Sequence, residues 1–274
     1  MEEMNMCIVL VLANQKGGCS KTGVTLNLGI GLARAGKKVL LIDADPQGSL
    51  TASLGFQEPD ELPVTLATIM TSIISEKEYS PEEGILHHEE GVDLLPSNIE
   101  LSGVEVSLAN AMSREMVLKE YVDSVRDRYD WILIDCMPSL GVMTINALVA
   151  ADRVLIPVQA AYLPVKGLEQ LIRTITVVKK RLNKTLRIEG ILITMVDYRT
   201  NYAKDITDML RSCYGGTVGV MESYIPFSVR VAEASAEGIS IYRYAPNCRA
   251  AASFLQLTEE VLAKEAGQRG GAEA

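Results

Sequence analysis

The sequence predicts a single doubly wound α/β domain, in which helices cover both faces of a mostly parallel β-sheet. Apolar runs of strand length alternate with segments of helical periodicity, and the runs are apolar throughout. Strands that read this way are buried on both faces, which is typical of a parallel sheet covered by helices. No Pro- or Ser-rich linker divides the 274 residues. We therefore expect one domain over residues 1–266 and a disordered tail, Gly-rich and polar, over 267–274.

The first half of the chain sets the pattern. Residues 6–13 form a continuous apolar run, followed by a Gly-rich turn and by Leu26, Ile30 and Leu32 at helical spacing. This predicts a strand, a loop and a helix in that order. The same reasoning predicts strands at 38–43, 92–95 and 131–135 and helices at 66–75 and 113–129. In the second half it predicts strands at 153–158 and 188–194 and helices at 165–182, 202–213 and 249–263.

Composition excludes several classes of protein. Hydrophobic residues make up 48% and charged residues 22%, which is ordinary for a globular domain. The five cysteines are scattered without a Cys-x-x-Cys pair, so we expect reduced thiols in the cytoplasm and neither a zinc knuckle nor a disulfide framework. No apolar run approaches the roughly 18 residues of a membrane helix, and the acidic start is unlike a signal peptide. We expect no membrane partner.

The charge is uneven along the chain. The net charge of −9 argues against a nucleic-acid partner, because phosphate binding needs clustered Lys and Arg. Residues 166–211, however, contain ten basic and five acidic residues, so this segment carries +5 and the remainder −14. One face of an acidic protein can therefore be basic.

A candidate phosphate-binding loop, Asn14-Gln15-Lys16-Gly17-Gly18-Cys19-Ser20-Lys21-Thr22, lies between the first predicted strand and helix. In such a P-loop, backbone N–H groups and the helix N-terminus face phosphate oxygens. Lys21 would reach the outer phosphates and the Thr22 hydroxyl would bind Mg²⁺. The ordinary pattern fails at two positions, since Gln15 and Ser20 stand where glycines are expected. An ordinary glycine turn is the alternative.

Three aspartates follow predicted strands. Asp43 and Asp45 lie two apart at the carboxyl end of one strand, so both side chains project to the same side, at the edge where open α/β sheets bind ligands. Asp135 ends another strand, which is the Walker B arrangement for holding Mg²⁺. The alternative is that these carboxylates only cap loops or a helix.

The deviant form Lys-Gly-Gly-x-x-Lys-Thr restores the loop match, because Lys16 adds a cation five residues before Lys21. Together with Asp43-Ala44-Asp45-Pro46-Gln47-Gly48, Asp135-Cys136-Met137-Pro138 and the segment from Ile225-Pro226 to Ala234, it resembles the landmarks of the ParA family of DNA-partition ATPases in order and spacing. The resemblance spans nearly the whole chain. It also resembles the related MinD proteins in this loop.

The resemblance implies an ATPase that binds Mg²⁺ and ATP, dimerises as a nucleotide sandwich and binds DNA without sequence preference. It implies a cytoplasmic, nucleoid-associated protein with a ParB-like centromere-binding partner in plasmid, chromosome or mobile-element partition. Asp45 would orient the attacking water, and Lys16 would reach the phosphates of the partner protomer. The implied nucleotide-binding residues are Lys16, Gly17, Gly18, Cys19, Ser20, Lys21, Thr22, Gly23, Pro226 and Phe227. The implied metal residues are Thr22, Asp135 and Asp43, and the implied DNA-binding residues are Arg230, Arg199, Lys204 and Arg211.

Two positions depart from the family pattern. Ser20 replaces the glycine before the P-loop lysine, and Gly23 stands where the family usually has Thr. If Ser20 takes a positive φ, strain of about 1 to 3 kcal/mol follows, equivalent to roughly ten- to hundredfold weaker binding. Gly23 loosens the first helical turn by about 1 kcal/mol relative to Ala. Slow or weakened ATP turnover is the expectation, and a degenerate scaffold without turnover is an alternative.

Two further alternatives lack their sequence features. A MinD-like membrane switch needs a C-terminal amphipathic helix with basic and bulky apolar residues, and residues 265–274 offer one Arg and no large apolar side chain. A cluster-carrying relative of the nitrogenase iron protein needs paired cysteines, which the spacing does not supply. The adjacent His87 and His88 point to different faces of any helix or strand, so we predict a surface loop there and no joint metal site.

Overall fold

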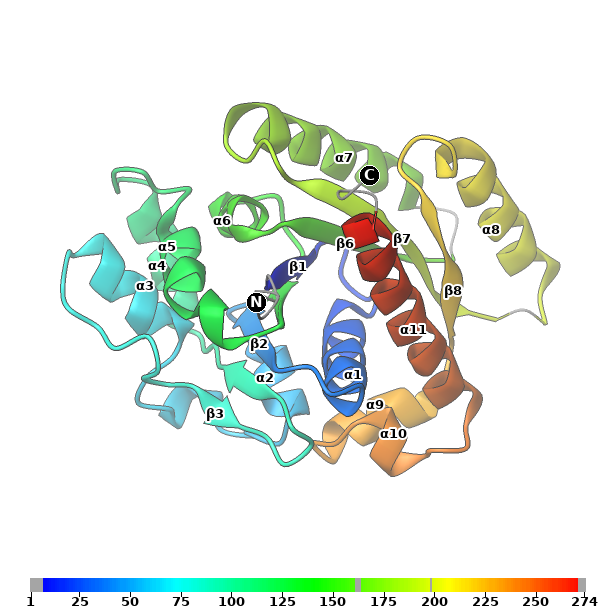
Figure 1. The fold of residues 1–274 in the computed structure, drawn as a ribbon, viewed down its shortest axis with the longest axis horizontal. Coiled ribbons are helices and arrows are strands. Elements are labelled where there is room, and N and C mark those ends of the chain that lie inside the picture. The colour runs from blue at the N-terminus through cyan, green and yellow to red at the C-terminus, as the bar shows by residue number, and fades with distance from the viewer. Residues whose placement is uncertain (1–6, 161–163, 198, 271–274) are drawn as a thin grey trace.

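The computed structural model describes residues 7–160, 164–197 and 199–270 and forms an α/β fold around one sheet (Figure 1). The described part contains eight strands in the order β3-β4-β2-β5-β1-β6-β7-β8, and all neighbours are parallel except β3 and β4. The strands are β1 (Ile8–Leu12), β2 (Val39–Ala44), β3 (Leu86–His87), β4 (Asp93–Leu95), β5 (Trp131–Cys136), β6 (Arg153–Gln159), β7 (Arg187–Val196) and β8 (Val220–Pro226). The mostly parallel sheet is confirmed.

Helices cover both faces of this sheet, each over its own hydrophobic core. One face carries α3 (Leu66–Ile74), α4 (Leu101–Leu108), α5 (Val117–Val125), α6 (Val142–Ala150), α7 (Pro164–Arg181) and α8 (Asn201–Tyr214). The other carries α1 (Lys21–Arg34), α2 (Ser49–Ser53), α9 (Val229–Ala236), α10 (Ile241–Tyr244) and α11 (Arg249–Gly270). Short 3₁₀ turns lie at Pro59–Glu61 and Arg126–Arg128. Alternate residues of β1 enter the two cores, Val9 and Val11 one and Leu10 and Leu12 the other.

Strand register places the candidate site residues at one edge of the sheet. β1 lies between β5 and β6, with Leu12 opposite Asp135. β2 lies on the other side of β5, with Asp43 opposite the same Asp135. The carboxyl ends of β1, β2 and β5 therefore adjoin, and the loop that follows β1 shares an edge of the sheet with both aspartates.

Most predicted elements are present within one to three residues, but one helix was placed wrongly. The prediction of a helix over 113–129 fails at its start, since α5 begins at Val117. Ser113 has a left-handed φ of 49°, and the N–H of Met116 donates to its carbonyl in a turn. At its other end α5 gives way to the 3₁₀ turn Arg126–Arg128.

The C-terminal helix is longer than predicted. α11 continues to Gly270, so residues 267–270 are helical where the composition indicated a disordered tail. Residues 271–274 lie outside the described part of the chain. The poor helix propensity of the glycines indicated a disordered tail, but α11 continues through them.

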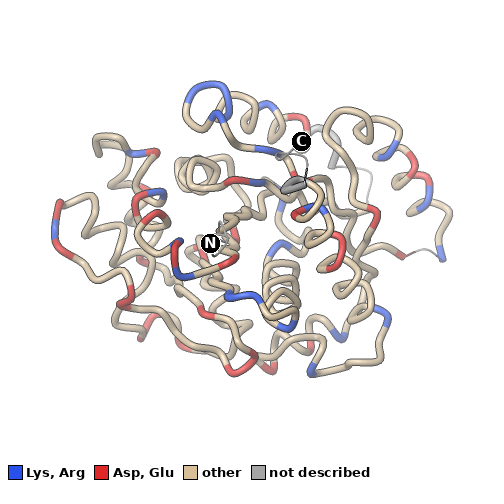
Figure 2. Tube along the Cα trace, in the orientation of Figure 1, with Lys and Arg blue, Asp and Glu red and all other residues tan. Residues whose placement is uncertain are grey.

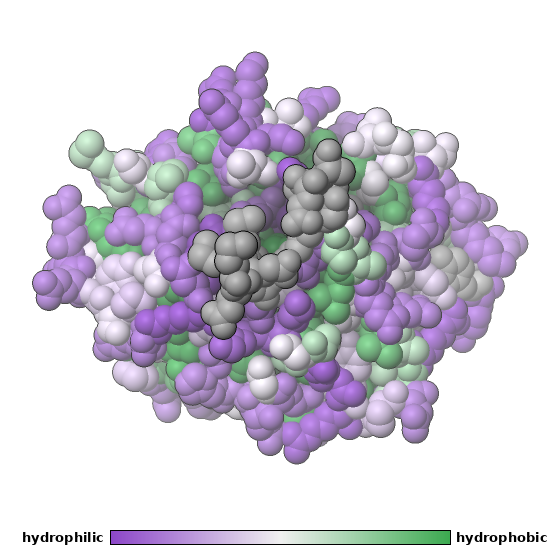
Figure 3. All heavy atoms as spheres, in the orientation of Figure 1, coloured by the Kyte–Doolittle hydropathy of each residue, from purple (hydrophilic) through white to green (hydrophobic). Residues whose placement is uncertain are grey.

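The visible surface is mostly hydrophilic, with hydrophobic residues scattered between charged ones (Figure 3). Within residues 7–160, 164–197 and 199–270, no helix is long and apolar enough to cross a membrane. His87 is exposed and close to Asp93, whereas His88 is partly buried and bonds the Gly238 carbonyl, so the two imidazoles do face different groups.

Candidate nucleotide-binding site

The loop between β1 and α1 is tied to the sheet by hydrogen bonds. The Asn14 amide donates to the Pro157 carbonyl of β6 at 2.7 Å, and its oxygen accepts from the Lys16 N–H at 3.0 Å. From the other side, the Thr194 hydroxyl of β7 donates to the Cys19 carbonyl at 3.0 Å. The loop is therefore held at both ends by side chains, which keeps its backbone in one shape.

Two residues of the loop have left-handed backbone angles. Gly18 has φ 72° and Ser20 has φ 64°. Gly18 and Gly17 have no heavy atom within 4 Å of an added Cβ, so space lies open in front of both. The conditional prediction of a positive φ at Ser20 is thus met, and a non-glycine residue carries the strain that this conformation implies.

Lys21 is buried at the start of α1. Its Nζ donates to the Lys16 carbonyl at 3.2 Å and lies 3.9 Å from the Cys19 sulfur. The ammonium thus lies inside the curve of the loop. Lys16 itself is half-buried in the same loop. Burial raises the pKa of the Cys19 thiol, so Cys19 is a neutral member of this loop.

Thr22 and Asp135, which were both predicted to bind Mg²⁺, contact each other, and their metal role stays a prediction. The Thr22 hydroxyl donates to Oδ2 of Asp135 at 2.7 Å. Oδ1 of Asp135 is buried and has no hydrogen-bond partner among the described residues. Burial, with the neighbouring Asp43 as the next cause, raises the pKa of Asp135 to about 8. A buried, unpartnered carboxylate oxygen is costly unless something else satisfies it.

Asp43 behaves differently from the prediction that places it beside a metal. Its Oδ2 accepts from the Thr51 N–H at 2.9 Å and from the Thr51 hydroxyl at 2.8 Å, and its Oδ1 accepts from the Asp45 N–H at 3.2 Å. Burial raises the pKa of Asp43 to about 6. Both oxygens are engaged within the protein, which favours a role in holding the β2–α2 loop; its metal role stays a prediction.

Asp45 is the more available carboxylate of the pair. It is half-buried, and its Oδ1 accepts from the Gln47 N–H at 3.0 Å. The turn is closed by Gly48, whose N–H donates to the Asp45 carbonyl at 3.0 Å. Asp45 therefore lies on a defined turn, and its Oδ2 accepts no hydrogen bond from the described residues, a geometry suited to orienting a small ligand such as water.

The residues present fit a magnesium–nucleotide complex better than a free metal ion. No group of three or more His, Cys, Asp and Glu side chains in the described chain can hold a metal ion. Mg²⁺ commonly binds through one or two protein oxygens and completes its shell with phosphate and water oxygens. The unpartnered Oδ1 of Asp135 beside the Thr22 hydroxyl supplies that limited set.

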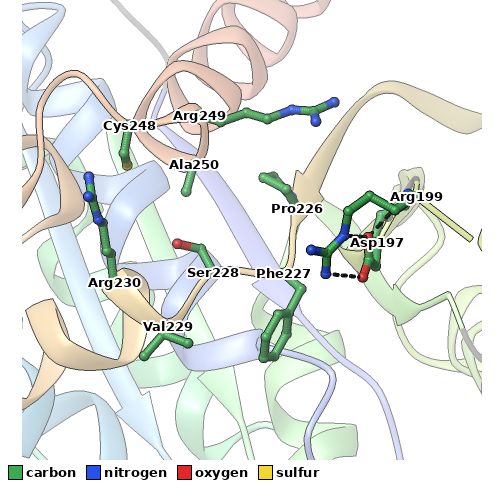
Figure 4. A pocket seen from close by; sticks show the side chains of 11 residues that line it. Asp197, Arg199, Pro226, Phe227, Ser228, Val229, Arg230, Cys248, Arg249 and Ala250 are labelled. Atoms are coloured by element: carbon green, nitrogen blue, oxygen red, sulfur yellow. Dashed lines mark hydrogen bonds and ion pairs between the residues drawn. The ribbon is translucent and has the colours of Figure 1, made fainter.

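A cavity of about 690 Å³ lies where β7 and β8 end and α9 and α11 begin (Figure 4). It is lined by Pro226 and Phe227, both predicted to bind nucleotide, and by Asp197 and Ser228. Phe227 is 58% exposed. The P-loop adjoins this region, because Cys19 is bonded to Thr194 of β7.

The four predicted DNA-binding residues fall into two groups. Arg199 forms an ion pair with Asp197 and Arg211 one with Glu222. Lys204 and Arg230 are exposed and form no ion pair with the described residues. Arg230 and Arg199 both line the cavity, whereas Lys204 lies on α8, where basic residues alternate with acidic ones (Figure 2). The predicted basic segment is thus partly neutralised by its neighbours.

Sequence reasoning missed the residues that hold the site together. Thr51 fixes Asp43, Thr194 fixes the P-loop carbonyl, and Asp197 lines the cavity. The position of Thr194 and Asp197 at the end of a predicted strand was an available signal, since ligands bind at carboxyl ends of strands. Nothing in the local sequence marked Thr51, which is eight residues from the carboxylate that it bonds.

Several known proteins are similar in sequence to this chain. The AAA domain family matches residues 7–188. The sporulation initiation inhibitor protein Soj of Bacillus subtilis is 40% identical over 261 residues, covering 93% of this chain and 98% of Soj. The chromosome partitioning protein ParA of Caulobacter vibrioides is 36% identical over 259 residues, covering 94% of each protein.

Solved structures similar to this one hold nucleotides. A structure of cobyrinic acid a,c-diamide synthase from Mycobacterium smegmatis with bound ATP analog and magnesium has a TM-score of 0.83 and 34% identity, covering 93% of this chain and 94% of that one. The septum site-determining protein MinD from Pyrococcus horikoshii, complexed with Mg-ADP, has a TM-score of 0.72 and 26% identity, covering 93% and 96%.

Proposed function

The chain belongs to the ParA/Soj family of chromosome-partitioning ATPases, and from this premise we propose that it binds Mg·ATP at the loop from Lys16 to Gly23. The observation that carries the proposal is the Thr22–Asp135 pair, with one buried carboxylate oxygen left for a cation. The nucleotides and magnesium held by the similar solved structures support it.

Each residue of the loop has a part in this proposal. The N–H groups from Gly17 to Thr22 and the N-terminus of α1 bind phosphate oxygens. Lys21 leaves the Lys16 carbonyl and pairs with the outer phosphates. Thr22 and Asp135 hold magnesium, which when bound neutralises charge that develops on the phosphates. Pro226 and Phe227 contact the base beside the cavity.

Hydrolysis is assigned to Asp45 with Lys16. Asp45 accepts a hydrogen bond from the attacking water and orients it toward the terminal phosphate. Lys16 supplies positive charge to the phosphates of a second protomer, which makes the active form a dimer. We expect slow turnover, because Ser20 and Gly23 depart from the family pattern within the phosphate-binding loop and Ser20 has a left-handed backbone.

For the effector step we propose cytoplasmic, nucleoid-associated binding to double-stranded DNA without sequence preference, with a ParB-like protein as partner. Dimerisation would double the exposed cations Arg230 and Lys204 on one assembly. An acidic protein of net charge −9 needs such local clustering to bind phosphate. Arg199 and Arg211 would have to exchange their carboxylate partners for phosphates.

Titration calorimetry of the full chain with Mg·ATP tests the site. We expect Lys21→Ala to weaken binding by about a hundredfold or more, since a charged hydrogen bond in a partly buried loop contributes up to about 3 kcal/mol. Lys180→Ala, at the exposed far end of α7, removes the same charge and should leave the affinity unchanged. Equal affinities for the wild type and Lys21→Ala would overturn the proposed site.

A further inference from the structure

The two positions that depart from the family pattern lie against each other. Gly23 is the third residue of α1, and Ser20 is the residue before that helix. A Cβ added at Gly23 would lie 3.0 Å from the Ser20 hydroxyl oxygen and 3.7 Å from a methyl group of Val231 on α9. The first distance is tighter than nine in ten Cβ contacts, so the Ser20 hydroxyl would have to move by a few tenths of an ångström, and the second is ordinary van der Waals contact.

The direction of the Ser20 side chain explains this contact. With φ 64° and ψ 28°, Ser20 is left-handed, and its hydroxyl makes no capping hydrogen bond to the start of α1. It lies instead beside the first turn, on the side where α9 packs. The N–H groups at the beginning of α1 are consequently left for another acceptor, which in a P-loop is phosphate.

We propose that Gly23 is a positioning residue whose missing side chain makes room for the Ser20 hydroxyl, so that the two departures compensate each other. This inference rests on the proposed nucleotide site and adds a requirement to it. A side chain at position 23 would turn the hydroxyl toward the N–H groups at the start of α1 or displace the loop backbone. Either change competes with phosphate for the same donors.

Thermal unfolding of the chain without nucleotide tests the packing. In the Ser20→Gly background no hydroxyl crowds an added Cβ at position 23. Gly23→Ala should therefore raise the unfolding temperature by about 2 to 4 °C through helix propensity. In the Ser20 background the same substitution should give no rise or a fall. Gly103→Ala is a matched control, because Gly103 is also the third residue of its helix, α4, and has open space around an added Cβ. It should give the same rise in both backgrounds.

Titration with Mg·ATP then tests the consequence for binding. With Ser20 present, Gly23→Ala should weaken binding about five- to tenfold, and the double variant Ser20→Gly with Gly23→Ala should bind at least as tightly as the wild type. Equal effects of Gly23→Ala in the two backgrounds would overturn the pairing. Failure of both Gly23→Ala and the double variant to fold would also overturn the pairing. Folding of the double variant alone would support the pairing.

The two readouts separate the pairing from the proposed function. If the wild type binds no nucleotide, the proposed function fails, but the unfolding temperatures still report whether positions 20 and 23 are coupled. If nucleotide binds and the unfolding temperatures are additive, the site stands and the pairing is wrong. Gly23→Thr adds two more heavy atoms than Gly23→Ala and, with Ser20 present, should weaken Mg·ATP binding further.

Discussion

At the scale of single residues, Asp135 concentrates the chemistry of the site. It is buried against Asp43, the residue opposite it in the neighbouring strand, and has one oxygen without a partner among the described residues. Burial is the main cause that raises the pKa of Asp135, and the charge of the adjacent Asp43 adds to it. The pKa of about 8 at Asp135 means that the chain without metal holds a proton there at neutral pH.

This proton makes stability depend on pH. The folded-state pKa of Asp135 lies above its unfolded value of about 4, so between roughly pH 4 and 8 the folded chain holds a proton that the unfolded chain releases. Stability should therefore fall as pH rises through this window, and Asp135→Asn should flatten the fall. Urea unfolding without nucleotide at pH 5, 6.5 and 8 measures it, with the exposed Asp123→Asn as the control. Parallel curves for the wild type and Asp135→Asn would contradict the assigned protonation.

Asp45 is expected to separate binding from hydrolysis. Orienting the water contributes to the transition state and little to the ground state, so Asp45→Ala should bind Mg·ATP within about threefold of the wild type and hydrolyse it at least about tenfold more slowly. The variant should then accumulate as an ATP-bound dimer in light scattering. A variant that stays monomeric with ATP while the wild type dimerises would remove Asp45 from this role.

At the scale of elements, the turn between β2 and α2 positions Asp45 through a glycine. Gly48 has φ 59°, and a Cβ there would lie 3.0 Å from the Ser97 carbonyl oxygen and 3.2 Å from Pro59. Backbone atoms and a proline ring cannot turn aside as a flexible side chain does. The position thus combines a left-handed conformation with a close approach.

Gly48→Ala is therefore expected to destabilise the chain by about 2 to 4 kcal/mol, of which about 1 kcal/mol is the cost of φ alone. Gly36→Ala isolates that smaller cost, because Gly36 has φ 83° and nothing within 4 Å of an added Cβ. Denaturant unfolding of both variants gives the difference. Equal losses in the two would mean that the Ser97 contact relaxes freely.

The elements also show how far sequence reasoning reaches. Buried strands such as β1 and β5 are predicted well because both of their faces are apolar. The sequence did not predict α6, which is apolar without a clear periodicity, or β8, whose buried and exposed residues alternate only partly. The P-loop, with Thr22, was predicted from its likeness to the deviant Lys-Gly-Gly-x-x-Lys-Thr pattern, because the ordinary spacing fails at Gln15 and Ser20. Asp135 was predicted from its place at a strand end, and the binding roles of these residues stay predictions. The contact between Thr51 and Asp43 was not predicted, because it depends on how α2 packs.

At the scale of the whole molecule, the proposed DNA step requires an acidic protein to bind an acidic polymer. The exposed cations of the proposed DNA surface, Arg230 and Lys204, stand among acidic neighbours, and Arg199 and Arg211 are ion-paired. A monomer presents too little positive charge in one place. A dimer of two nucleotide-bound copies would present twice as much positive charge.

We expect filter binding of duplex DNA to require ATP and to weaken steeply with salt, because binding releases counterions from the phosphates. Arg230→Ala and Lys204→Ala should each weaken binding about threefold to tenfold on every sequence alike while Mg·ATP affinity persists. Lys77→Ala changes the net charge equally at an exposed position outside residues 166–211 and serves as the control. If ATP-loaded protein retains no duplex even at low salt, the DNA step is wrong and a protein-scaffolded switch becomes the better interpretation.

The position of β1 has a consequence for how the molecule is made. β1 is synthesised before the other seven strands of the described sheet, yet Ile8 pairs with Trp131 and Leu10 with Arg153, which lie more than 120 residues later in the sequence. Such distant pairings form slowly, since a long loop must close before any contact rewards it. Until β5 and β6 are synthesised, the segment that will bind nucleotide has an apolar strand beside it with both edges open. A nascent chain of this protein is therefore most exposed to misassociation while only its first half has been made. It becomes protected when β6 pairs with the open edge of β1.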